Sequence, residues 1–133
     1  MKPVFTVAPV RSRIDSPIHI TASGLAPGER VTIRTKVMDG ALREWESLAV
    51  VEADDAGAVD LSRMAPLEGS TYRGVDGEGP LWSMQGPDRS KFFTRNLPVE
   101  LEYHSELCRG DSVIASTRFR RHFGDGVTWG QVH

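Results

Sequence analysis

Apolar and polar residues alternate with a period of two along much of this sequence. The clearest run puts Leu101, Tyr103 and Leu107 on one side of an extended segment and acidic residues on the other. Such alternation is typical of a β-strand with one face buried and the other in water. The pattern recurs at 18–22, 31–37 and 45–51, in a short segment at 58–61, and at 113–119, where Val113, Ala115, Thr117 and Phe119 share the predicted inner face. It predicts an all-β protein.

Glycine and proline separate these segments. The chain has 13 glycines and 8 prolines among 133 residues, a larger share than in an average domain. Gly24–Gly28, Asp54–Gly57 and Arg109–Asp111 fall between predicted strands, and Gly and Asp are the residue types that tight turns need. Strands that recur every 8 to 15 residues or so are typical of a sandwich or a barrel.

Charge and cysteine content exclude several classes of protein. The formal net charge is -2, whereas a nucleic-acid-binding domain needs an excess of clustered cations. The single cysteine, Cys108, allows no disulfide within the chain and favours a reducing compartment. No run of about eighteen apolar residues could cross a membrane. We therefore expect a cytoplasmic protein that binds neither nucleic acid nor membrane.

No pattern for catalysis or metal binding is recognisable. No serine or cysteine stands in the Gly-x-Ser-x-Gly turn that exposes a hydrolase nucleophile, and we expect Cys108 to be a partly buried small apolar residue. Glu102, His104 and Glu106 share one strand face at about 7 Å spacing, which leaves open an enzyme that binds a metal there. Their alternation with apolar residues favours a water-facing strand instead. We predict no catalytic, cofactor-binding or metal-binding residue.

The basic residues cluster in the last predicted strand. Alternation places Arg118 and Arg120 on one face of that strand and Arg121 on the other. Such a group can contact phosphates or the acidic surface of a neighbouring domain, and the alternative is a solvated strand face. Arg109-Gly110-Asp111 matches the tripeptide that integrins bind, but we favour an ordinary hairpin turn for these residues.

Several short motifs occur in an order typical of one family. They are Gly24-Leu25-Ala26-Pro27-Gly28, Val31-Thr32-Ile33-Arg34, Trp45-Glu46-Ser47, Val59-Asp60-Leu61, Gly69-Ser70-Thr71-Tyr72 and Gly79-Pro80-Leu81-Trp82-Ser83-Met84. With them, the chain resembles the N-terminal domain of the acyl-CoA thioesterase and bile-acid-CoA:amino-acid N-acyltransferase family, from about Ile14 to Phe119. The resemblance implies an immunoglobulin-like antiparallel β-sandwich at 1–122. It also implies that 123–133 begin a linker to an α/β-hydrolase domain that this sequence does not include.

The resemblance also implies that catalysis belongs to the hydrolase domain. In this family the hydrolase domain supplies the nucleophile, Asp and His, and it cleaves the thioester of fatty acyl-CoA or transfers the acyl group. None of those residues has a counterpart here, so we expect a non-catalytic domain without a cofactor, covalently followed by the hydrolase domain. Arg118, Arg120 and Arg121 lie near the expected linker. The alternative is a free-standing immunoglobulin-like binding module.

Leu81, Trp82 and Met84 are the candidate domain-docking residues. They lie in a Gly- and Pro-rich region, Glu68–Leu97, in which only Arg89–Arg95 suggests a helical turn. In a regular strand Leu81 and Trp82 would point to opposite faces, so either both faces are covered or one side chain is exposed. The resemblance implies that the hydrolase domain covers the exposed one.

Overall fold

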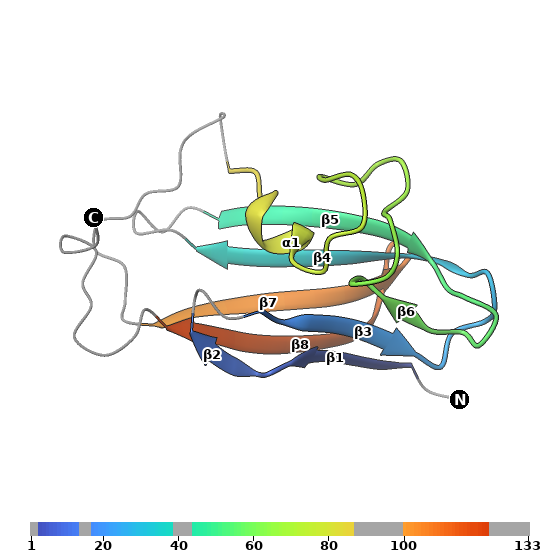
Figure 1. The fold of residues 1–133 in the computed structure, drawn as a ribbon, viewed down its shortest axis with the longest axis horizontal. Helices are drawn as coiled ribbons and strands as arrows, with labels where there is room; N and C mark the ends of the chain where they lie inside the picture. The colour runs from blue at the N-terminus through green and yellow to red at the C-terminus, as the bar shows by residue number, and fades with distance from the viewer. Residues whose placement is uncertain (1–2, 14–16, 39–43, 87–99, 123–133) are drawn as a thin grey trace.

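Two β-sheets pack face to face in the computed structural model, which describes residues 3–13, 17–38, 44–86 and 100–122 (Figure 1). The smaller sheet has the order β1-β3-β6, formed by β1 (Val4–Ala8), β3 (His19–Ser23) and β6 (Val59–Asp60). The larger sheet has the order β2-β8-β7-β4-β5, formed by β2 (Arg11–Arg13), β8 (Ser112–His122), β7 (Glu100–Arg109), β4 (Arg30–Met38) and β5 (Glu44–Glu52). The predicted all-β sandwich is confirmed.

A short helix, α1 (Gly79–Trp82), lies in the connection from β6 to β7. It packs near β4 and β5. Among the described residues, no helix has the length and apolar character that crossing a bilayer requires.

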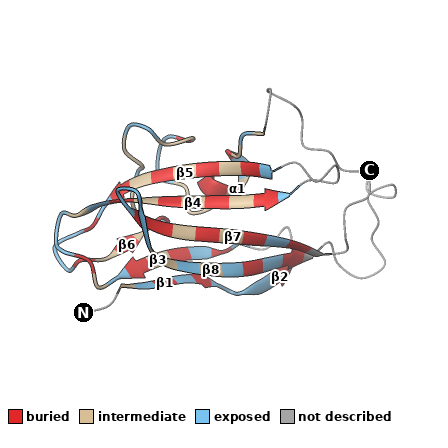
Figure 2. Ribbon diagram, turned by 180° about the vertical axis from the view of Figure 1, so that it is seen from behind, coloured by how far each residue is buried: buried red, intermediate tan, exposed pale blue. Residues whose placement is uncertain are grey.

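The two-residue period of the sequence sets which side chains form the core. Along both β4 and β5, every second residue is buried, and the two strands pair antiparallel from Arg30↔Glu52 to Met38↔Glu44. Figure 2 shows the resulting alternation of buried and intermediate residues along β4 and β5, with exposed residues at the strand ends. For β4 and β5, the period therefore predicted both the strands and their inner faces correctly.

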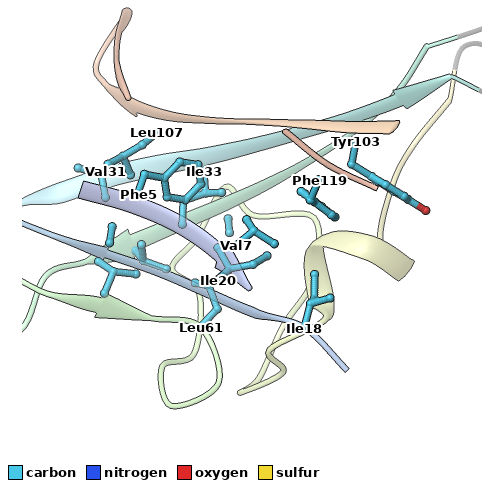
Figure 3. Close-up of a cluster of buried hydrophobic side chains, with 14 of the residues drawn as sticks. Phe5, Val7, Ile18, Ile20, Val31, Ile33, Leu61, Tyr103, Leu107 and Phe119 are labelled. Carbon is cyan, nitrogen blue, oxygen red and sulfur yellow. The ribbon is translucent and has the colours of Figure 1, made fainter. Parts of the chain in front are cut away.

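The core lies between the two sheets. Figure 3 shows side chains from both layers pointing toward one another, with Val7 and Ile20 of the smaller sheet facing Ile33 of the larger one. The Tyr103 and Phe119 rings stack with centroids 4.9 Å apart. Two polar side chains at the same depth satisfy each other: Thr35 and Ser105 share a hydrogen bond of 2.8 Å between their hydroxyls.

Two N-terminal strands were not predicted from the sequence. β1 belongs to the smaller sheet and β2 to the larger, and the Ala8–Pro9 peptide bond between them is cis. β2 runs parallel to β8, with Arg11 opposite Arg120. Among the described strands, all the other pairs are antiparallel. Segments of three to five residues interrupted by proline are too short for a period to be recognised.

The prediction for Val113 was wrong, because a β-bulge changes the facing of residues in β8. Leu107 pairs with Ala115, but Cys108 pairs with Val113, so Ile114 is an extra residue in β8. An extra residue shifts the alternation by one position. Val113 is consequently 51% exposed, whereas Phe119 is buried as predicted.

The hairpin between β7 and β8 has the turn predicted for it. Gly110 has a φ of 59°, the left-handed conformation that favours glycine. The Arg109 side chain donates two hydrogen bonds to the Glu29 carboxylate, one of them from Nη2 to Oε1 at 3.1 Å. These bonds hold the pKa of Glu29 below its usual value. Arg109 thereby connects this hairpin to the turn that precedes β4.

Gly57 tests how closely the chain packs at the end of the sandwich. Its φ is 72°, and a Cβ there would lie 2.0 Å from the Leu25 carbonyl oxygen. We expect Gly57→Ala to cost more than about 2 kcal/mol of unfolding free energy, from strained backbone and steric overlap together. Gly110→Ala is the control: its φ is also positive but no atom lies within 4 Å of the new Cβ, so it should cost about 1 kcal/mol. Equal losses in urea titrations would contradict the close approach.

Candidate domain-docking surface

The segment that follows β6 covers the outer edge of β5. The Leu67 N–H donates to the Val50 carbonyl at 2.7 Å, and the Val50 N–H donates to Ser70 Oγ at 2.8 Å. The Thr71 N–H donates to the Leu48 carbonyl at 2.9 Å, and the Leu48 N–H donates to Thr71 Oγ1 at 3.1 Å. An open edge of a sheet exposes unpaired backbone groups that attract other strands. Here side-chain hydroxyls and backbone groups of one loop satisfy them.

The same segment returns to β5 after α1. Glu46 and Gln85 exchange two backbone hydrogen bonds, of 2.8 and 3.1 Å. Thr71 and Ser83, on the two arms of the segment, are joined by a hydroxyl–hydroxyl bond of 2.7 Å. α1 is therefore attached to the sandwich on both sides, although it has only four residues.

Tyr72 fills the space beneath α1. It is only 4% exposed, and a Cβ at Gly79 would lie 2.3 Å from its ring, so only glycine permits this packing. Tyr72 also lines a hollow of about 390 Å³ formed by residues 66–70, 72 and 73. None of the described residues hydrogen-bonds its buried hydroxyl. Burial raises the pKa of Tyr72 to about 12, and the Asp76 carboxylate acts in the same direction.

α1 separates the three candidate docking residues by exposure. Leu81 and Met84 are half-buried and pack against the core, whereas Trp82 is 63% exposed. The sequence left two alternatives: either both faces are covered or one side chain is exposed. The structure has the second, with the Trp82 side chain exposed. The geometry is a helical turn rather than a strand. Arg89–Arg95, where a helical turn was expected, lies outside the described residues.

Asp76 holds the exposed indole in place. Its Oδ2 accepts a hydrogen bond of 2.8 Å from Trp82 Nε1, and its Oδ1 accepts one of 2.9 Å from the Glu78 N–H. The Trp82 ring also meets the Tyr72 ring edge-on, with centroids 6.3 Å apart. The sequence did not predict this role. An aspartate two residues before a turn is a common local pattern, but its bond to Trp82 depends on the fold.

The three arginines lie on opposite faces of β8, as predicted. Arg118 and Arg120 are exposed on the outer face and contact Glu102, at 3.8 and 3.3 Å. Arg121 is only 5% exposed. Its Nη2 lies 3.5 Å from the Arg13 carbonyl oxygen and 3.9 Å from a carboxylate oxygen of Glu78. The structure therefore does not gather them into one basic site.

The row Glu102, His104 and Glu106 lies on the outer face of β7, and its carboxylates take part in ion pairs. Glu102 pairs with the arginines of β8, and Glu106 lies 3.8 Å from Lys36 Nζ. Within the described ranges, no three His, Cys, Asp or Glu side chains are placed to hold a metal ion. Cys108 is buried, and burial raises the pKa of its thiol. A catalytic cysteine needs the opposite shift.

Comparison with known proteins identifies relatives for nearly all of the chain. The family described as the acyl-CoA thioester hydrolase/BAAT N-terminal region matches residues 15–133. Acyl-coenzyme A thioesterase 5 of Mus musculus is 37% identical over 131 residues, which cover 92% of this chain and 31% of that protein. Acyl-coenzyme A thioesterase 3 of Mus musculus is 36% identical over 109 residues, covering 80% of this chain and 25% of that protein.

A relative that is named for a different activity is similar to almost the same extent. Bile acid-CoA:amino acid N-acyltransferase of Homo sapiens is 35% identical over 123 residues, covering 85% of this chain and 28% of that protein. The chain thus spans between about a quarter and a third of the length of these relatives.

Tyr72→Phe tests the packing beneath α1. At neutral pH we expect no loss of unfolding free energy, because the variant removes a buried hydroxyl that no described group satisfies. The pKa is about 12 in the folded chain against an ordinary value of 10.0. The Tyr72 phenol therefore stays protonated to a higher pH in the native state than in the unfolded chain, which stabilises the native state. The stabilisation is complete below pH 10 and is lost as the pH rises toward 12. It amounts to at most about 3 kcal/mol.

Urea titrations at about pH 8 and about pH 12 measure the effect. The unmodified chain should lose more stability between the two than Tyr72→Phe does. Equal losses would show that the Tyr72 hydroxyl is solvated.

Proposed function

Because this chain belongs to the acyl-CoA thioester hydrolase/BAAT N-terminal region family, we propose that it is the non-catalytic N-terminal domain of an acyl-CoA thioesterase. Two of the relatives above are named for acyl-coenzyme A thioesterase activity and one for amino-acid acylation from a bile acid-CoA. All three act on an acyl-CoA by name. A CoA thioester is therefore the proposed substrate of the whole protein.

In this proposal residues 1–122 form an immunoglobulin-like domain, 123–133 begin a linker, and an α/β-hydrolase domain follows. The nucleophile of that second domain would attack the thioester carbonyl and release CoA as a thiol. Water or an amino acid would then resolve the acyl-enzyme. The buried Cys108 fits a domain that takes no chemical part and works in a reducing, cytoplasmic compartment.

The single observation that carries a docking role is the exposed indole of Trp82. Trp is enriched among the residues that dominate binding energy at interfaces, so an exposed indole is a good candidate anchor for a partner. Val75, also exposed at 57%, adjoins Asp76, which binds that indole. The relatives are more than three times longer than the matched segment. The proposed occupant of this surface is accordingly the hydrolase domain of the same polypeptide.

The alternative is a free-standing module that uses this surface for a separate partner. Both hypotheses use Trp82, and they differ in what covers it. An enzyme built on Glu102, His104 and Glu106 is disfavoured, because ion pairs with Lys36 and with arginines of β8 already engage its carboxylates.

Trp82→Ala and Trp45→Ala form a matched pair for the docking proposal. Trp45 is 7% exposed in the core, so truncation should cost about 3 to 5 kcal/mol of the unfolding free energy of this chain. Trp82→Ala should cost less than about 1 kcal/mol here. In the full-length protein it should weaken the contact between domains and split one calorimetric transition into two. A large loss in this chain alone would make Trp82 a core residue.

Catalysis by this chain alone is the second test. We expect no release of CoA from a long-chain acyl-CoA above the rate in buffer, because the sequence has no nucleophile turn. Turnover measured with a thiol reagent, if it persisted on repurification and disappeared in His104→Ala, would contradict the proposal. That result would support an active site at Glu102, His104 and Glu106 on β7.

A further inference from the structure

Trp82 is exposed and yet fixed in position. Its Nε1–H donates to Asp76 Oδ2 at 2.8 Å, and one ring edge contacts Tyr72. Tyr72 is itself fixed, because Gly79 leaves no space between α1 and its ring. The indole therefore has one polar edge and one ring edge in contact with its own chain, while 63% of the residue remains exposed.

Asp76 connects this side chain to the backbone of α1. Oδ1 accepts from the Glu78 N–H at 2.9 Å, and the Asp76 carbonyl accepts from the Gly79 N–H at 3.0 Å. The carboxylate thus starts the helical turn with one oxygen and orients the indole with the other. Removing only the second contact should leave the turn intact.

A side chain that is already ordered loses less conformational entropy on binding. An indole N–H that is already bonded also needs no acceptor from a partner, whereas an unbonded one would be left unsatisfied on burial. Both effects make Trp82 a better anchor than a mobile tryptophan on the same surface.

We infer that Asp76 is the positioning residue of the docking surface: it holds the Trp82 indole outward so that the ring enters an apolar pocket that offers no hydrogen-bond acceptor. This inference rests on the proposed function, since it specifies how that surface binds. Val75, next to Asp76 and exposed, lies at the margin of the covered area.

The orienting contact is tested in this chain first. Asp76→Asn keeps one oxygen for the Glu78 N–H and turns an amide N–H₂ toward the indole. The ¹H–¹⁵N resonance of the Trp82 indole is assigned by its loss in Trp82→Phe. We expect it to shift in Asp76→Asn and its hydrogen exchange to accelerate at least about fivefold. Asp111→Asn, at the distant hairpin tip, should change neither. An unchanged Trp82 resonance in Asp76→Asn would overturn the inference.

The full-length protein then links the contact to docking. In a Val75→Cys background, the alkylation rate of the new thiol reports how often the surface opens. Cys108 is buried and its thiol pKa is raised, so it competes little. We expect alkylation to be slower than in this chain alone, and Asp76→Asn to accelerate it about 3- to 10-fold. The acceleration should disappear when Trp82→Phe is also present, since the two substitutions then remove the same contact.

The outcomes distinguish the proposed docking from the inferred role of Asp76. If the thiol reacts as fast in the full-length protein as in this chain alone, the surface is uncovered and the proposed docking is wrong. If the thiol is protected but Asp76→Asn does not accelerate its reaction, docking stands and the role of Asp76 is overturned.

Discussion

The outer edge of β5 is the constraint on which the rest of this structure depends. A five-stranded sheet that ends in β5 has a row of backbone donors and acceptors with no neighbouring strand, and such an edge must be covered or it will pair with another chain. The loop after β6 covers it from Leu67 to Gln85, using the Ser70 and Thr71 hydroxyls as well as backbone groups. Because both arms of the loop are bonded to β5, a four-residue helix between them can hold a fixed position.

That fixed position gives the molecule its one exposed aromatic anchor among the described residues. Leu81 and Met84 pack against the core while Trp82 faces outward. The short segment around α1 therefore contributes side chains both to the core and to the surface. Elsewhere in the described part of the chain, the carboxylates of β7 pair with cations, and the single thiol is buried. In the function proposed above, this domain affects catalysis through the surface that it covers and the position that it gives to the neighbouring domain.

The sequence predicted most of the sandwich, because a two-residue period directly encodes which face of a strand is buried. Val31, Ile33 and Ala49 are buried where the period puts them. The bulge at Ile114 was not predictable, since it depends on how β7 and β8 are paired, and it reverses Val113. The candidate docking residues Leu81, Trp82 and Met84 were chosen because three large apolar side chains lie within four residues of a Gly- and Pro-rich segment. The role of Asp76 and the contact of Arg121 with the Arg13 carbonyl were not predicted, because Trp82 and Arg13 are brought close to these residues only by the fold.

The most direct test of this account is amide hydrogen exchange at Leu48 in β5, in the unmodified chain and in Thr71→Val. Thr71 Oγ1 accepts from this amide at 3.1 Å and is also bonded to Ser83 Oγ, so the substitution removes an edge contact and a connection to α1 together. The account predicts a protected Leu48 amide that exchanges about fivefold faster, or more, in Thr71→Val. The control Thr6→Val, on the exposed face of β1, should leave it unchanged. A Leu48 amide that exchanges in the unmodified chain as fast as an open edge would contradict the account.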